Sequence, residues 1–158
     1  MSTSSAKAKF NWADPLLLTS QLTSDERQVM EAANSYCQER LAPRVVQAFR
    51  NEYTDVAIFK EMGDLGLLGP TIPEEYGGAG GDFTHMAVLF EELAYSGDRS
   101  FGVHVHAIAA QYILNHGTEE QKQYFLPKMA SGEMIGAIAM SEPGAGSDLQ
   151  GIRTSAVK

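Results

Sequence analysis

The chain has 158 residues, of which 44% are hydrophobic and 20% are charged, a balance typical of one soluble domain with a core of its own. Its formal net charge of -8 argues against nucleic-acid binding, which needs basic surface patches. Its apolar runs fall short of the roughly 18 residues that a membrane span requires, so we expect no membrane span.

The first nine residues are small, polar and mildly basic, and they lack the apolar centre of a signal peptide. We expect a flexible tail over residues 1–9; a shortened transit peptide is the alternative, against which the lack of Arg argues. The lone cysteine, Cys37, excludes an internal disulfide and a multi-cysteine metal site. Its spacing from apolar neighbours predicts a core position on a helix face, and its isolation indicates a reducing compartment.

Helical patterns fill the first third of the chain. The run Thr23-Ser-Asp-Glu26 is a capping box, which predicts a helix from there to about Arg40. Pro43 then predicts a break or a restart, and a second apolar segment covers residues 45–49. A shorter helix is expected over about 55–65.

A glycine-rich stretch separates these helices from the next. Residues 69–81 hold five glycines and two prolines, which exclude regular structure, although Ile72 and Tyr76 are suited to anchor the loop to a core. A helix with regular apolar spacing is expected to begin near Asp82 or Thr84.

The following segment, about 100–115, is apolar nearly all round, which predicts the central and most buried helix. His104 and His106 lie two residues apart, so they cannot share a helix face or a metal ion, and we expect one packed and one exposed. A second capping box, Thr118-Glu-Glu-Gln121, opens a helix in which Pro127 predicts a kink or a break.

Glu91 and Glu92 form a pair of adjacent carboxylates within a predicted helix. Paired carboxylates are one pattern of acid–base chemistry. Charged neighbours on a helix are more often a solvated face, and we interpret this pair in that way. We assign no metal ligands in the sequence.

The most informative stretch is 139–151, Ala-Met-Ser-Glu-Pro-Gly-Ala-Gly-Ser-Asp-Leu-Gln-Gly. The apolar run 134–140 leads into it and predicts a buried strand. Proline and glycine end that strand, and glycine lets the backbone approach a flat or charged ligand closely. The hydroxyls of Ser141 and Ser147 add donors and acceptors, so the stretch is suited to hold a polar ligand at a strand end.

The order of elements is an all-helical domain over about 10–132, followed by one strand. A single strand leaves its backbone groups unpaired. We therefore expect the chain to be the front part of a longer protein.

The stretch 139–151 resembles the flavin-site signature of the acyl-CoA dehydrogenases at every position. Further stretches agree with that family, namely 65–78, 91–94, 116–122 and 126–133. Residues 10–78 resemble glutaryl-CoA dehydrogenases, and residues 79–158 resemble long-chain acyl-CoA dehydrogenases.

This resemblance implies a mainly α chain: the N-terminal helical-bundle domain of the acyl-CoA dehydrogenase fold over 10–132, then the start of the β middle domain over 133–158. It implies FAD as cofactor, acyl-CoA as substrate, an electron-transfer acceptor as partner and a homo-oligomer. The compartment is then the cytoplasm, or the mitochondrial matrix in a eukaryote. The family removes a proton from Cα and a hydride from Cβ of an acyl thioester.

The resemblance also implies roles for particular residues. The isoalloxazine ring is expected to be bordered by the backbone of Ile138, Ala139 and Met140 together with Ser141. Gly146 and Ser147 are expected where FAD meets the pantetheine arm of the substrate. Arg99-Ser100 resembles the motif by which glutaryl-type enzymes hold a far carboxylate; an ion pair at a helix start is the alternative for Arg99.

The catalytic glutamate of the family corresponds to a position beyond residue 158, and Glu142 belongs to the signature without being that base. We therefore expect the N-terminal part of an FAD-dependent acyl-CoA dehydrogenase that is inactive alone. The alternative is a non-catalytic helical module that binds a partner or self-associates, from a split or truncated gene.

Overall fold

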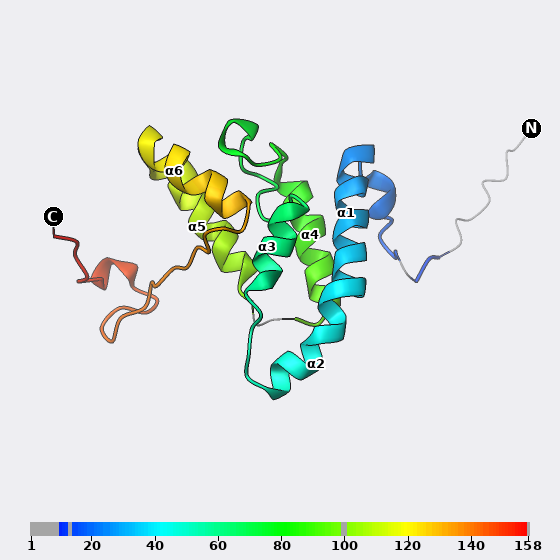
Figure 1. The fold of residues 1–158 in the computed structure, drawn as a ribbon, viewed down its shortest axis with the longest axis horizontal. Coiled ribbons are helices and arrows are strands. Elements are labelled where there is room, and N and C mark those ends of the chain that lie inside the picture. Colours follow the sequence, from blue (N-terminus) through cyan, green and yellow to red (C-terminus); the bar gives the residue numbers. More distant parts are fainter. Residues whose placement is uncertain (1–9, 13, 99–100, 158) are drawn as a thin grey trace, which may run out of the picture.

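The computed structural model describes residues 10–12, 14–98 and 101–157 and shows a bundle of helices with a C-terminal segment that leaves it on one side (Figure 1). Its α-helices in chain order are α1 (Ser24–Tyr36), α2 (Ala42–Arg50), α3 (Ala57–Asp64), α4 (Phe83–Tyr95), α5 (Val103–His116) and α6 (Glu119–Ala130). The predicted mainly helical class is confirmed. The tail predicted over 1–9 lies outside the described residues. Each helix in the described ranges is too short or too polar to span a bilayer.

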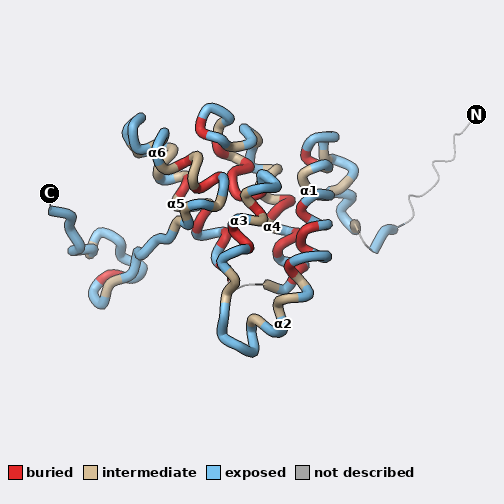
Figure 2. Tube along the Cα trace, in the orientation of Figure 1, coloured by how far each residue is buried: buried red, intermediate tan, exposed pale blue. Residues whose placement is uncertain are grey.

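Buried side chains gather between the helices, as the red stretches of Figure 2 show. One hydrophobic cluster joins the first half of the chain to α4, through Ala33, Cys37, Leu41, Ile58, Phe59, Met62, Leu67, Leu68, Leu89 and Leu93, with Phe101 and Val103 beside them. A second joins the glycine-rich loop to α5 and α6, through Ile72, Tyr76, Ala110, Leu126, Met129 and Ala130. Cys37 is a core residue as predicted, and burial raises the pKa of its thiol to about 11.

The helix starts follow local hydrogen-bond chemistry. Both predicted capping boxes are present: Thr23 pairs with Glu26, and Thr118 pairs with Gln121. A third box, which the sequence pattern did not predict, opens α4 with Asp82 as the cap. It escaped notice because its third residue is His85 rather than Glu or Gln.

The predicted break at Pro43 takes a different form. Residues Cys37–Leu41 make a π-helical turn, in which the N–H of Ala42 donates to the carbonyl of Cys37. Helix α2 follows at once, so the chain stays helical while its direction changes (Figure 1). Proline has no N–H to offer the preceding turn, and the wider π turn accommodates that loss.

Helix α2 contributes no buried residue, so polar contacts place it. The guanidinium of Arg44 donates to Glu61 of α3, with 2.7 Å between Nη2 and Oε2. The hydroxyl of Tyr36 donates to the same carboxylate at 3.0 Å, and Asp55 lies 3.7 Å from Arg44. This partly buried group of charges connects α1, α2 and α3.

The prediction that α5 is the most buried helix is wrong. Its buried residues are Val103, His106 and Ala110, whereas Ile108 and Tyr112 are 47% and 50% exposed. One face packs on α6, and another borders a hollow of about 430 Å³ between α4 and α5. An all-round apolar pattern cannot indicate which faces of a helix will be covered.

Pro127 does not divide α6, which is one helix over Glu119–Ala130. Of the two predicted forms, the break is therefore wrong, whereas a kink stays a prediction. The lost backbone hydrogen bond is offset by the capping box at Thr118 and by the burial of Leu126 and Met129 around the proline.

The loop over 69–81 is anchored as predicted, although it does contain one short 3₁₀ turn, Glu74–Tyr76. Ile72 and Tyr76 are 2% and 6% exposed, and the hydroxyl of Tyr76 donates to Glu119 of α6 at 3.0 Å. The loop is thus fixed to the second hydrophobic cluster.

The carboxylate pair on α4 is only half as predicted. Glu91 is exposed, whereas Glu92 is 8% exposed and accepts a hydrogen bond from the amide of Asn34 on α1 at 2.7 Å. The solvated-face interpretation is therefore wrong for Glu92, because a buried carboxylate acquires a partner from a neighbouring helix.

The predicted buried strand over 134–140 is also wrong. These residues have no regular secondary structure and are largely exposed, seen as the pale trace in Figure 2. Within the described residues the only bridge of strand type joins Glu142 to Ala145. A strand forms only where another extended backbone supplies its hydrogen bonds, and in the described chain no strand lies beside 134–140; the single backbone bond there joins Met134 to Lys128 of α6.

Two glycines bring the end of α6 against α3. A Cβ at Gly132 would overlap the carbonyl oxygen of Phe59, and a Cβ at Gly63 would overlap that of Ser131. Gly132 also has φ of +74°, which L side chains rarely adopt. The chain can therefore turn sharply after α6 and enter residues 134–136 along the helical body.

Replacing Gly132 by Ala should lower the free energy of unfolding by about 2–4 kcal/mol, because it adds left-handed strain to a backbone clash. Gly66→Ala is the matched control, since Gly66 has φ of +72° and open space around it. That control should cost only about 1 kcal/mol. Urea unfolding followed by circular dichroism measures both; equal losses would contradict the close approach.

Candidate functional site

The signature segment forms a small hairpin beyond the helical body. The N–H of Glu142 donates to the carbonyl of Ala145 at 2.9 Å, and the reverse bond is 3.1 Å long. Pro143 and Gly144 occupy the turn between them. Because the two backbones pair in this way, Ser141 and Gly146 follow on opposite sides of the hairpin and flank its open end.

The carboxylate of Glu142 closes the rest of the segment onto this hairpin. It accepts from the N–H of Arg153 at 2.9 Å, from the N–H of Thr154 at 2.8 Å and from the Thr154 hydroxyl. The hydrogen bonds from Thr154 and Arg153 lower the pKa of Glu142. Its oxygens are therefore engaged within the loop.

The residues expected to border a ligand are all exposed. Ile138 and Met140 are 37% and 39% exposed, and the exposed class also includes Ala139, Ser141, Gly146 and Ser147. Among the described residues, neither serine hydroxyl has a hydrogen-bond partner, and nothing lies within 4 Å of a Cβ built at Gly146. The segment therefore presents free polar groups and an unobstructed backbone on one loop.

The helical domain matches the sequence model of a known protein family. The sequence model of "Acyl-CoA dehydrogenase, N-terminal domain" matches residues 23–133, which is more than half of the chain. The chain belongs to the acyl-CoA dehydrogenase family. The helical fold and the signature at 139–151 agree with this membership.

Similar proteins include the mitochondrial long-chain specific acyl-CoA dehydrogenase of Sus scrofa, 41% identical over 140 residues, which are 87% of this chain and 33% of that protein. The structure of glutaryl-CoA dehydrogenase from Mycobacterium smegmatis matches with a TM-score of 0.80 and 35% identity over 90% of this chain and 38% of that one. The acyl-CoA dehydrogenase of Bacillus anthracis complexed with FAD gives 0.78 and 33%, over 84% of this chain and 23% of that one. The chain spans about a third of the length of the curated relatives it matches.

The substrate residues proposed from the resemblance are not all placed. Arg99 and Ser100 lie outside the described residues. Ser147 is exposed two residues beyond the hairpin, next to Gly146. Residues 138–141 and 146–147 precede and follow the hairpin and are exposed on one segment.

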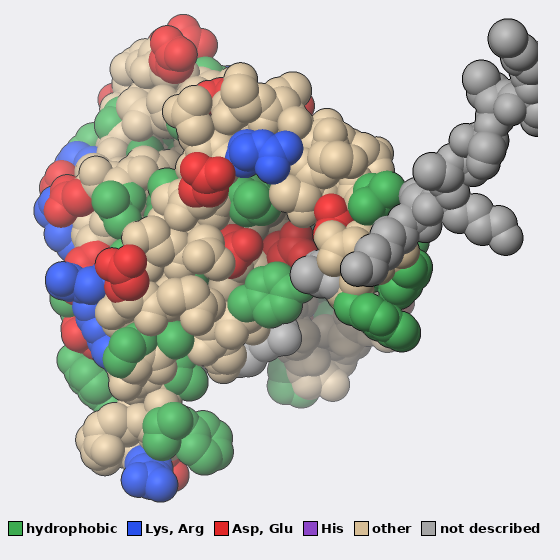
Figure 3. All heavy atoms as spheres, turned by 90° about the vertical axis from the view of Figure 1, so that its right-hand side faces the viewer, with side chains coloured by type: hydrophobic (Ala, Val, Ile, Leu, Met, Phe, Trp, Pro, Cys, Tyr) green, Lys and Arg blue, Asp and Glu red, His purple; other side chains and the backbone are tan. Residues whose placement is uncertain are grey.

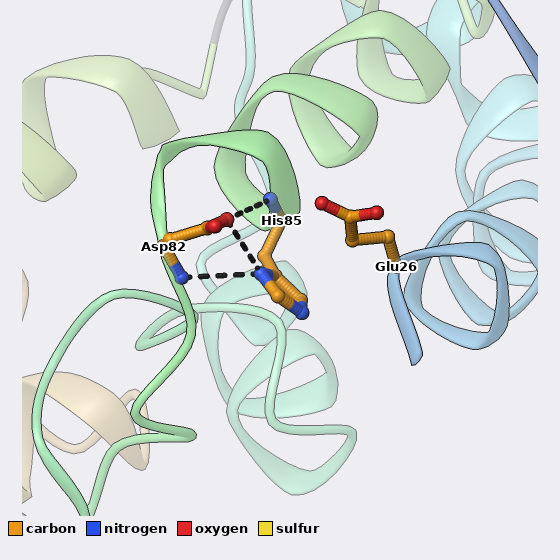
Figure 4. A group of neighbouring side chains, drawn as sticks. All are labelled: Glu26, Asp82 and His85. Carbon is orange, nitrogen blue, oxygen red and sulfur yellow. Dashed lines mark hydrogen bonds and ion pairs between the residues drawn. The ribbon is translucent and has the colours of Figure 1, made fainter. Parts of the chain in front are cut away.

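A second polar group, shown in Figure 4, lies where the starts of α1 and α4 meet. The ring of His85 turns back to Asp82, with Nδ1 2.8 Å from Oδ1, and its Nε2 lies 3.0 Å from Asp25. Glu26 approaches from α1, and ligand atoms of Glu26, Asp82 and His85 lie within 4.8 Å of one another. Each of these side chains also belongs to a helix cap, so the group is explained as a contact between two helix ends.

The protein surface beside α1 carries mixed charge. On the face shown in Figure 3, Lys and Arg side chains lie among Asp and Glu rather than in one broad group. Apolar side chains are scattered between them. Such a surface is typical of a solvated face and not of one that binds nucleic acid.

Sequence reasoning missed the contacts that organise the segment. The hydrogen bonds of Glu142 to residues 153–154 span more than ten positions, and no local pattern indicates them. The bond between Gly136 and His106 joins residues 30 apart. The two-residue spacing predicted that one of His104 and His106 is packed without saying which, and the partner of His106 depends on how the chain turns after α6.

The His85 contact predicts a pH-dependent stability. Hydrogen bonds to Asp82 raise the pKa of His85 above its ordinary 6.5, while burial opposes the shift and Asp25 reinforces it. Below pH 6.5 the protonated Nδ1 donates to the Asp82 carboxylate in place of accepting from the Asp82 N–H, and the stabilisation by this ion pair is complete. It is lost as pH rises through the folded-state pKa. Urea unfolding should show a fall in stability over that range that is absent in His85→Gln.

A second variant, Asp25→Asn, tests the assignment of the partners. It removes the lesser carboxylate and keeps Asp82, so the pH dependence should shrink without vanishing. A pH profile that is the same in the parent and in His85→Gln would show that this contact does not contribute.

Proposed function

We propose that the chain is the N-terminal part of an FAD-dependent acyl-CoA dehydrogenase and that residues 138–147 form one wall of its flavin and acyl-CoA site. The family membership and the exposed signature loop support this proposal. The single observation that carries it is the free edge of residues 138–141 beside an unobstructed Gly146. We also propose that the helical domain ends near residue 132 and that residues 133–158 begin the middle domain.

The loop is suited to a flat, polar group. In the described structure the backbone N–H groups of residues 138–141 make no hydrogen bond, and the Ser141 hydroxyl is free beside them. A ring with several carbonyl and nitrogen acceptors satisfies such donors. Ile138 and Met140 offer exposed apolar surface for the face of the ring.

Bound FAD would supply the acceptor for the hydride that leaves Cβ of the acyl thioester. Residues of this chain would orient the ring: donors at 138–141 bind its polar edge and stabilise negative charge that develops there. Ser147 would contact the pantetheine arm of the substrate. We infer that the base that takes the Cα proton is supplied by the part of the subunit that lies outside residues 1–158, and that an electron-transfer protein accepts the electrons.

Titration with FAD tests the cofactor assignment by NMR of the ¹⁵N-labelled chain. Amide shifts should change in residues 138–147 and not in α1 or α2. Ser141→Ala should weaken the response by about 2–10-fold, the loss expected of one hydrogen bond. ADP, which lacks the ring, is the control ligand. Millimolar FAD without any response in 138–147 would contradict the proposal.

Turnover tests the division of labour. Residues 1–158 mixed with FAD and an acyl-CoA should not bleach the flavin absorbance, because the catalytic base is expected elsewhere in the subunit. Bleaching by this chain alone would show that our placement of the base is wrong.

Self-association is a second candidate function, favoured by one observation. Helix α2 buries none of its residues, and its apolar side chains Phe49 and Val46 are 84% and 60% exposed. Apolar side chains grouped in this way are typical of an interface. Light scattering should show a second copy bound in the parent and less in Phe49→Ser; a monomer in both would remove this candidate.

A further inference from the structure

One buried polar side chain has a role that the helical core alone does not require. His106 on α5 is fully buried, as predicted for one of the two neighbouring histidines, while His104 is exposed. Its Nδ1 lies 3.0 Å from the backbone nitrogen of Gly136. Gly136 stands two residues before Ile138, where the expected flavin wall begins.

The direction of this hydrogen bond fixes the state of the imidazole. A backbone N–H can only donate, so Nδ1 must be the unprotonated acceptor, and the proton of the neutral ring is on Nε2. That Nε2 is buried without a hydrogen-bond partner among the described residues. Burial lowers the pKa of His106, which favours the neutral ring, and the backbone of Met129 opposes this shift only in part.

The main chain at Gly136 is pressed onto the helical body. A Cβ built there would lie 2.6 Å from Cε of Met129 and 2.9 Å from Cβ of Ala109, so a side chain at this position would have to displace its neighbours. The N–H of Met134 makes a second attachment, to the carbonyl of Lys128 at 3.0 Å. Alternate N–H groups of residues 134–136 therefore hold the segment against α5 and α6.

Gly136 is also the last residue in the described chain that is hydrogen-bonded to the helical body. In the described part of the chain, the hydrogen bonds of residues 137–157 are all with one another. Figure 1 shows this part leaving the bundle beside α5 and α6. The direction in which residues 138–141 depart is consequently set by what holds Gly136.

We propose that His106 is a positioning residue for the flavin wall: its Nδ1 holds the backbone of Gly136 and so determines where residues 138–141 lie relative to the helical domain. The identity of the ligand that residues 138–141 contact rests on the proposed function. The hydrogen bond between His106 and Gly136 does not depend on it. A histidine that merely filled space between α3 and α5 would need no acceptor at Nδ1, although its ring does contact Phe59, with centroids 5.6 Å apart.

Amide hydrogen exchange of the 158-residue chain, measured by NMR without FAD, tests the hold on Gly136. His106→Leu keeps an apolar side chain and removes the acceptor, so exchange at Gly136 should quicken roughly tenfold or more while α1 and α4 stay unchanged. His106→Asn should restore much of the protection, because its Oδ1 stands near the position of Nδ1. His104→Asn, at the exposed neighbouring histidine, is the matched control and should change nothing at Gly136.

Titration with FAD gives a second measurement, which would not change if His106 served only to pack the core. With Ser141 intact, His106→Leu should reduce the FAD response of residues 138–141, and His106→Asn should recover it. If Gly136 exchanges faster in His106→Leu while FAD never affects 138–147 in any variant, the hold stands and the proposed function fails. If FAD binds there equally in all variants, the function stands and the positioning role fails.

Two further results would overturn the inference. One is faster exchange across all of α5 and α6 in both His106→Leu and His106→Asn, which would indicate a packing role only. The other covers the case in which His106→Leu does not fold: long-range ¹H–¹⁵N spectra of the parent report the tautomer. A proton on Nδ1 would exclude the bond from Gly136, whereas an unprotonated Nδ1 supports it.

Discussion

The close approach of two backbones at the end of α6 is the constraint on which the placement of the C-terminal segment depends. Gly132 and Gly63 have no side chains, so the turn after α6 lies directly on α3. Only then can Met134 and Gly136 reach hydrogen-bond partners on α5 and α6. The absence of side chains at Gly132 and Gly63 thus determines the course of the segment that follows α6.

Polar contacts between distant elements add to the packing of the apolar clusters. Arg44 with Glu61, Asn34 with Glu92 and His106 with Gly136 each join elements distant in sequence. Such pairs add little net stability compared with apolar burial, but leaving one partner buried and unpaired is costly. They therefore favour one arrangement of the helices over others that would bury the same apolar surface.

Local chemistry made much of the fold predictable from the sequence. The capping boxes at Thr23 and Thr118 involve neighbours along the chain, and they were located correctly. The apolar spacing around Cys37 predicts a core residue, and Tyr76 is predicted to anchor the glycine-rich loop; both are buried. The family resemblance came from an uninterrupted motif, which needs no knowledge of the fold.

The wrong predictions share one cause: a sequence pattern does not indicate which other element will pack against a segment or pair with it. The apolar faces of α5 predicted complete burial, yet coverage depends on which helices lie beside it. The run at 134–140 has the composition of a strand but no backbone alongside it in the described chain. For the candidate site, residues 138–141 and 146–147 could be proposed from the sequence because they lie in one continuous motif. The hydrogen bonds of Glu142 and His106 could not, because their partners are distant in the sequence.

The loop closed by Glu142 separates two properties of the proposed flavin wall: its shape and its orientation. Its bonds to residues 153–154 lie within the segment, so the shape of the loop is internally determined. Its orientation is determined at Gly136, on the far side of an unbonded stretch. Residues 137–141 connect Gly136 to this loop and donate no backbone hydrogen bond of their own, so the shape of the loop and the place where it leaves the helical domain depend on separate sets of contacts.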